Sequence, residues 1–121
     1  MSAERVQFIR HGEKEILFIN FSGCRSHEVF QVIDQAKREI RKRPEQSVLT
    51  LTDVTNTRFD EKVTDEMKAF TLHNKPFVKA AAVVGVAGLR KIIFEAVMLF
   101  SKRKLHAFES HEQAKSWLVT A

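Results

Sequence analysis

The stretch from Lys79 to Phe108, KAAAVVGVAGLRKIIFEAVMLFSKRKLHAF, constrains the fold more than any other part of the chain. Its first part, Ala80 to Val86, is a continuous apolar run of strand length, which is typical of a strand inside a parallel sheet. Gly85 and Gly88 interrupt this run, and apolar residues then recur at helical spacing. Leu105 to Phe108 again has the composition of a strand. The stretch therefore predicts a βαβ unit, whose two strands pair in parallel.

The helix of this unit is expected to bury a stripe of apolar side chains against the sheet, namely Leu89, Ile92, Ile93, Ala96, Val97 and Phe100. At about 100° per residue, Phe94 and Met98 then point away from the sheet. Three cations, Arg90, Lys91 and Lys102, lie around this pair. An exposed apolar pair among cations predicts a contact surface for a second subunit, an acidic partner or anionic lipid headgroups. The alternatives are that another segment covers the pair or that both are isolated exposed side chains.

The rest of the chain supplies the other elements of an α/β sheet. Two short β-favouring runs, Val6 to Ile9 and Ile16 to Phe21, flank a turn and predict an antiparallel hairpin. A helix over about residues 27 to 43, capped by Ser26, is followed by a strand at Ser47 to Thr52. The second and fourth predicted helices carry caps at Asp60 and at Ser110, where Ser110 and Gln113 match a capping box. The predicted order is β-β-α-β-α-β-α-β-α, an open mixed sheet of about five strands in one domain, residues 1–121.

Charge and cysteine content limit the classes of partner and compartment. The net charge of +5 favours anionic partners. However, much of it falls on residues 37–43, where cations complement the dipole of a helix C-terminus. Basic and aromatic residues do not alternate as in RNA-binding strands, so nucleic-acid binding is not predicted. The single cysteine, the absence of a signal-like apolar segment in MSAERVQF and the shortness of the longest apolar run lead us to expect a cytoplasmic protein.

Three loops are expected to meet at the C-terminal ends of the parallel strands, where open α/β sheets commonly bind ligands. They are Ser22 to Ser26, Asp53 to Arg58 and Gly85 to Gly88. Backbone amides at a helix start favour anions, so these loops predict a site for a phosphate or carboxylate ligand. Its candidate residues are Ser22, Asp53, Asn56, Arg58, Gly85 and Gly88. The alternative is that the two glycines serve only the turn and close helix packing.

The sequence contains no recognisable catalytic motif. Cys24 has no defined spacing to any of the five histidines, His11, His27, His73, His106 and His111, and a lone buried thiol is the commoner arrangement. Zincin, serine-hydrolase and multi-cysteine metal motifs are absent. We therefore predict a protein that is not an enzyme and has no metal or cofactor.

Several phrases of the chain resemble the STAS family, the fold of sulfate-transporter and anti-sigma-factor-antagonist domains. They are the initial hairpin, LTLTDVT, NKPFVKAAAVVGVAGLRKIIFEAV and FESHEQAKSWL, which together extend over nearly the whole chain. The resemblance is stronger to stand-alone bacterial members, which are related to the lipid-transfer CRAL-TRIO domains. Anti-sigma-factor antagonists are phosphorylated on a serine of a D-S-S-G-like segment. This chain lacks that segment and offers Thr55 and Thr57 as phosphoacceptors in the corresponding loop.

The resemblance implies a non-enzymatic regulatory module that binds a protein partner through the 53–58 loop and is switched by phosphorylation there. A homodimer through Phe94 and Met98 is compatible with this function. The alternative is a carrier or sensor of a small lipid or anionic metabolite, implied by the relation to lipid-transfer folds and by the apolar helix after Gly88.

Overall fold

A computed structural model describes residues 4–121 and forms a five-stranded mixed sheet with four helices. Residues 1–3, the first part of the MSAERVQF stretch considered above, lie outside the described residues. The strands are β1 (Val6–His11), β2 (Lys14–Asn20), β3 (Val48–Asp53), β4 (Val78–Val84) and β5 (His106–Phe108). The helices are α1 (Ser26–Ile40), α2 (Glu61–Asn74), α3 (Leu89–Ser101) and α4 (His111–Leu118). The predicted element order and the antiparallel β1–β2 hairpin are confirmed.

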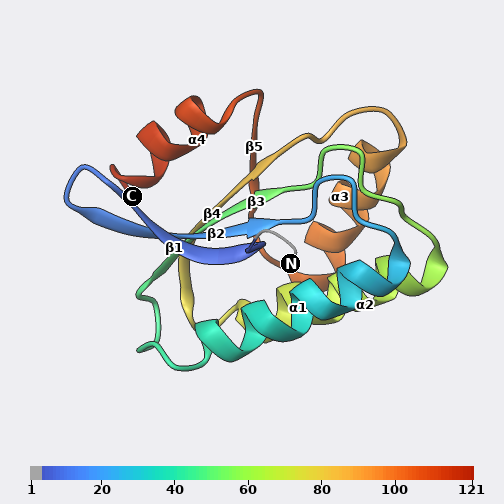
Figure 1. Cartoon of the computed structure of the whole chain (residues 1–121), viewed down its shortest axis with the longest axis horizontal. Helices are drawn as coiled ribbons and strands as arrows, with labels where there is room; N and C mark the ends of the chain where they lie inside the picture. The colour runs from blue at the N-terminus through green and yellow to red at the C-terminus, as the bar shows by residue number, and fades with distance from the viewer. Residues whose placement is uncertain (1–3) are drawn as a thin grey trace.

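The strands lie in the order β1-β2-β3-β4-β5, and all pairs after the first are parallel. Because each right-handed crossover steps in the same direction, the three crossover helices α1, α2 and α3 all fall on one face. The terminal helix α4 covers the opposite face (Figure 1). The sheet has no point where the strand order reverses, which is the usual position of a ligand site in open α/β folds.

Side chains of the central strands point alternately to the two faces of the sheet, so each strand contributes to a hydrophobic core on either face. In β3, Leu49 and Leu51 point to α4, whereas Val48, Thr50 and Thr52 point to the crossover helices. In β4, Ala81 and Val83 face the crossover helices, while the residues beside them face α4. The face toward α2 and α3 thus carries threonine and alanine where larger side chains would fill the space.

The helix caps follow the sequence only in part. The Asp60 carboxylate accepts a hydrogen bond from the Val63 amide at 2.8 Å, and the Ser110 hydroxyl accepts one from the Gln113 amide at 3.2 Å, as predicted. The prediction that Ser26 caps α1 is wrong, because Arg25 occupies the cap position. The Ser26 hydroxyl instead donates to the Asp60 carboxylate at 2.7 Å, which joins the starts of α1 and α2.

The predicted orientation of α3 is only partly correct, since Ile93 and Val97 face the core as expected but other residues do not. Leu89, Ile92 and Phe100, which were expected to pack on the sheet, are exposed. Phe94 and Met98, which were expected to face solvent, are half-buried, and Phe94 packs against the core. Contacts at both ends set this rotation. The Arg90 side chain donates to the Gly85 carbonyl at 2.9 Å, and the Leu105 amide lies 3.5 Å from the Met98 sulfur.

Candidate functional site

The structure brings the three loops at the C-terminal edge of the sheet together. The Gly23 amide donates to the Thr55 carbonyl, and the Val54 amide to the Val84 carbonyl, both at 2.9 Å. The Arg58 amide donates to the Cys24 carbonyl at 3.0 Å. These bonds engage the Gly23, Val54 and Arg58 amides, so these three groups are not free to bind an anion. The loops therefore close on one another.

The residues predicted to bind an anion at these loops have different surroundings from one another. The Ser22 amide donates to the Asn20 side chain at 2.9 Å, and Gly88 is exposed at the start of α3. Asn56 and Arg58 are also exposed. The Asp53 carboxylate contacts the Thr55 amide and the His111 side chain instead.

The two predicted phosphoacceptors differ in accessibility. Thr57 is buried, with 5% of its surface exposed, and its hydroxyl donates to the Phe21 carbonyl at 2.8 Å. Thr55 is half-buried next to Gly85. A kinase would therefore need to open the loop to reach Thr57, whereas Thr55 is partly accessible.

Asp53 and His111 form a polar contact that the sequence did not reveal. His111 Nε2 lies 2.8 Å from Asp53 Oδ2, and the Thr55 amide donates to Asp53 Oδ1 at 2.9 Å. Burial acts to raise the pKa of the Asp53 carboxyl, but hydrogen bonds from Thr55 and His111 outweigh it and lower this pKa below its ordinary value. The pair joins the end of β3 to the start of α4, 58 residues later. No local sequence pattern indicates a contact between such distant residues.

Cys24 is fully buried. Burial raises the pKa of its thiol, with a smaller opposing effect from Arg5. A raised pKa keeps the sulfur protonated, which makes it a poor nucleophile at neutral pH. Within residues 4–121, no group of three or more histidine, cysteine or acidic side chains is placed to hold a metal ion. No helix in the same residues is both long and apolar enough to cross a membrane.

A mostly apolar hollow lies between the sheet and helices α2 and α3. Its walls are aromatic and aliphatic side chains of all these elements, with the threonines of β3 on the sheet side. The cavity has a volume of about 80 Å³ and is partly open to solvent. The inner face of α3, with Ile93, Phe94 and Val97, forms one wall. We call this hollow the α3 cavity.

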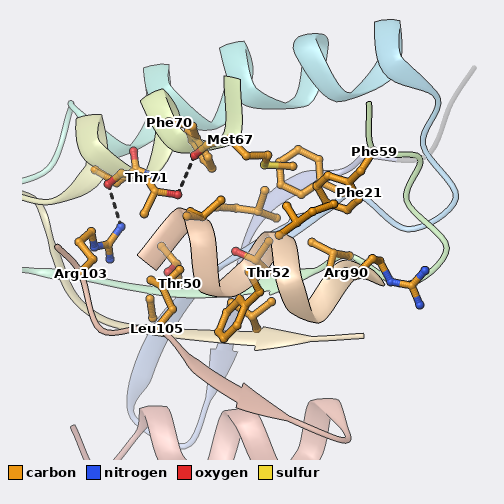
Figure 2. A pocket seen from close by; sticks show the side chains of 18 residues that line it. Phe21, Thr50, Thr52, Phe59, Met67, Phe70, Thr71, Arg90, Arg103 and Leu105 are labelled. Carbon is orange, nitrogen blue, oxygen red and sulfur yellow. Dashed lines mark hydrogen bonds between the residues drawn. The ribbon is translucent and has the colours of Figure 1, made fainter. Parts of the chain in front are cut away.

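Arginines lie at the two ends of the α3 cavity (Figure 2). Arg90 at one end donates to the Gly85 carbonyl and carries its charged group outward. Arg103 at the other end donates to the Thr71 carbonyl at 3.2 Å. Among residues 4–121, no carboxylate forms an ion pair with Arg103. Burial lowers the pKa of its guanidinium to about 10.

Arg103 does not stand out in the sequence, because it lies in the run Lys102-Arg103-Lys104, which has the composition of a solvated surface. Lys102 and Lys104 are exposed, and only the middle residue turns inward. Lys102 adopts a left-handed conformation with φ 55° at the end of α3, which redirects the chain before Arg103. The sequence feature that could have indicated the cavity is the threonine and alanine content of β3 and β4 on the face toward α2 and α3. Such small side chains fill the core incompletely.

Comparisons of the chain with protein-family models, with curated proteins and with solved structures find no match.

Proposed function

We propose that the protein binds a small amphipathic anion in the α3 cavity and serves as its carrier or sensor. The ligand class is an apolar chain that ends in a carboxylate or phosphate group. The observation that carries this proposal is Arg103, a half-buried cation that forms no ion pair within residues 4–121.

An unpaired cation in an apolar wall is costly, because its loss of hydration is not compensated by an opposite charge. An acidic ligand group beside Arg103 would supply that charge. The planar guanidinium matches the two oxygens of a carboxylate or phosphate, and both groups form their strongest hydrogen bonds with such a donor. The polar end of the ligand is therefore assigned to Arg103.

The rest of the α3 cavity suits the apolar part of the same ligand. Phe21, Phe70 and Phe94 are among its walls. Ligand pockets are mostly apolar, with few polar groups to orient the ligand. The threonine hydroxyls of β3 add polar atoms without adding charge. At about 80 Å³, the cavity suits a short apolar chain, or the first part of a longer acyl chain that continues through its open side.

The test compares two probes of equal length, decanoate and decanol, by displacement of the fluorescent anion anilinonaphthalene sulfonate. Arg103→Met keeps the length of the side chain but removes its charge. Hydrogen bonds to charged groups contribute roughly 1.5 to 3 kcal/mol, so we expect decanoate affinity to fall roughly tenfold to a hundredfold. Decanol affinity should stay unchanged, because its hydroxyl does not need the cation.

The matched control is Lys104→Met, which removes the same charge from an exposed neighbour. It should bind both probes as the parent does. An equal loss of decanoate affinity in both variants would mean that general attraction, and not Arg103, governs binding. An unchanged decanoate affinity in Arg103→Met would contradict the proposal.

A second candidate is the regulatory protein-interaction module that the STAS resemblance implies. Its support is the 53–58 loop, where Asn56 and Arg58 are exposed and Thr55 is partly accessible to a kinase. If decanoate binding does not depend on Arg103, this module becomes the stronger candidate.

A further inference from the structure

The outer face of α3 is apolar and exposed. The exposed fractions are 78% for Leu89, 64% for Ile92, 82% for Leu99 and 53% for Phe100. These are four of the five large apolar side chains that are exposed within residues 4–121. They recur at intervals that place them on one side of a helix, next to the side that lines the α3 cavity. A helix that is apolar on both sides is normally covered on both, so this face requires a partner.

Cations flank this outer face. Lys91, Lys102 and Lys104 are exposed, and the Lys68 ammonium of α2 lies 5.7 Å from the centre of the Phe100 ring. Glu95, one turn after Lys91, is the only carboxylate on α3. The surface thus combines exposed leucine, isoleucine and phenylalanine with a surplus of lysine at its edges. Helices that lie in the interface of a lipid bilayer have this combination.

Charge decides among the partners that would cover such a face. In a second copy of the chain, the lysines of both subunits would approach one another across the interface, which is unfavourable. An anionic bilayer instead complements both parts of the surface, because acyl chains accept the apolar side chains and lipid phosphates attract the lysines.

We propose that the outer face of α3, with Leu89, Ile92, Leu99 and Phe100, docks on the surface of an anionic lipid bilayer. At 13 residues, α3 would lie along the surface and not cross it. Its other face lines the α3 cavity, so docking would bring that cavity to the bilayer. The docking itself needs no cavity ligand, and it can therefore fail or succeed independently of the proposed function.

The test is flotation of the purified full chain with vesicles of phosphatidylcholine alone and of phosphatidylcholine mixed with phosphatidylglycerol. The parent should float with the mixed vesicles and only weakly with the neutral ones. Leu99→Gln should lower the partition coefficient on the order of tenfold, because the leucine no longer contributes apolar burial. Leu99→Met, which stays apolar, should bind as the parent does.

The charge contribution is tested with a second pair of variants. Lys91→Gln should lower the partition coefficient about fivefold on the mixed vesicles, since one basic residue near an anionic surface contributes about 1 kcal/mol. Lys14→Gln makes the same change in net charge in the β1–β2 hairpin and should have little effect. Circular dichroism of each variant checks that the fold is retained, which is expected because both substituted residues on α3 are exposed.

Three results would overturn the proposal. One is equal vesicle binding by Leu99→Gln and the parent. Another is equal binding to neutral and mixed vesicles. The third is a parent that does not float but sediments as a dimer that Leu99→Gln dissociates, which would assign the face to a second copy.

Discussion

Gly85 and Thr55 show how one residue can fix the relation between two loops. Gly85 has φ +93°, and a Cβ atom there would overlap the Thr55 hydroxyl and lie 2.5 Å from the Thr55 amide nitrogen. Real Cβ atoms do not approach backbone atoms so closely, and side chains rarely adopt this φ. The sequence identified Gly85 as a turn residue, with an anion site as one interpretation. The contact that requires glycine comes from the 53–58 loop, which no local pattern reveals.

We predict that Gly85→Ala lowers the free energy of unfolding by roughly 2 kcal/mol or more, because backbone strain and the overlap with Thr55 add together. Gly12→Ala is the matched control. Gly12 also has a positive φ, +62°, but nothing lies within 4 Å of an added Cβ. Its cost should be only the strain of about 1 kcal/mol. Urea unfolding of both variants gives the comparison, and equal losses would show that the contact with Thr55 costs nothing.

At the scale of elements, the sequence predicted which segments are helices and strands better than it predicted how they are rotated. The spacing of apolar residues was sufficient for the boundaries of α3 to within a few residues. It was not sufficient for its inner face, because Leu89, Ile92 and Phe100 form one helical stripe while Ile93, Phe94 and Val97 form another. The tertiary contacts of Arg90 and Met98 select between them. The α3 cavity follows from that selection, so it could not be predicted from periodicity alone.

The Asp53 and His111 contact is predicted to stabilise the docking of α4 on β3. Asp53→Asn should lower the free energy of unfolding at neutral pH by roughly 1 to 3 kcal/mol, since it weakens a charged hydrogen bond whose carboxylate is mostly buried. The Asp53 side chain is 13% exposed. Asn keeps an oxygen for the Thr55 amide, which limits the effect to the contact with His111.

The hydrogen bonds of the Asp53 carboxylate with Thr55 and His111 together give a dependence of stability on pH. The pKa of the Asp53 carboxyl is lower in the folded chain than its ordinary value of 3.8, which applies to the unfolded chain. Its contribution is therefore fully present above pH 3.8 and is lost as the pH falls through the lower, folded-state pKa. Urea midpoints measured from neutral pH into this acid range should fall less steeply for Asp53→Asn than for the parent. Asp65→Asn, at an exposed carboxylate of α2, should keep the parent's slope.

At the scale of the whole molecule, the sheet joins two cores that lie on its opposite faces. Ile16 and Leu51 belong to the core under α4, while Leu17 and Ile19 belong to the core under α1, α2 and α3. Neighbouring residues of one strand thus supply both cores. Neither core can be lost without releasing strands that the other requires, and this supports the prediction of a single cooperative domain.

Trp117 provides the test, because it is the chain's only tryptophan and lies on α4, with ring centres 4.3 Å from His106 and 5.5 Å from Phe108. Its fluorescence reports the α4 side, whereas far-ultraviolet circular dichroism reports all helices. We predict that both signals give one urea midpoint, as expected of a cooperative domain of this size. Leu118→Ala, which removes a fully buried side chain beneath α4, should lower the free energy of unfolding by roughly 2 to 5 kcal/mol. It should shift both midpoints equally. If only the fluorescence midpoint moved, α4 would unfold separately and the two faces would not be one cooperative unit.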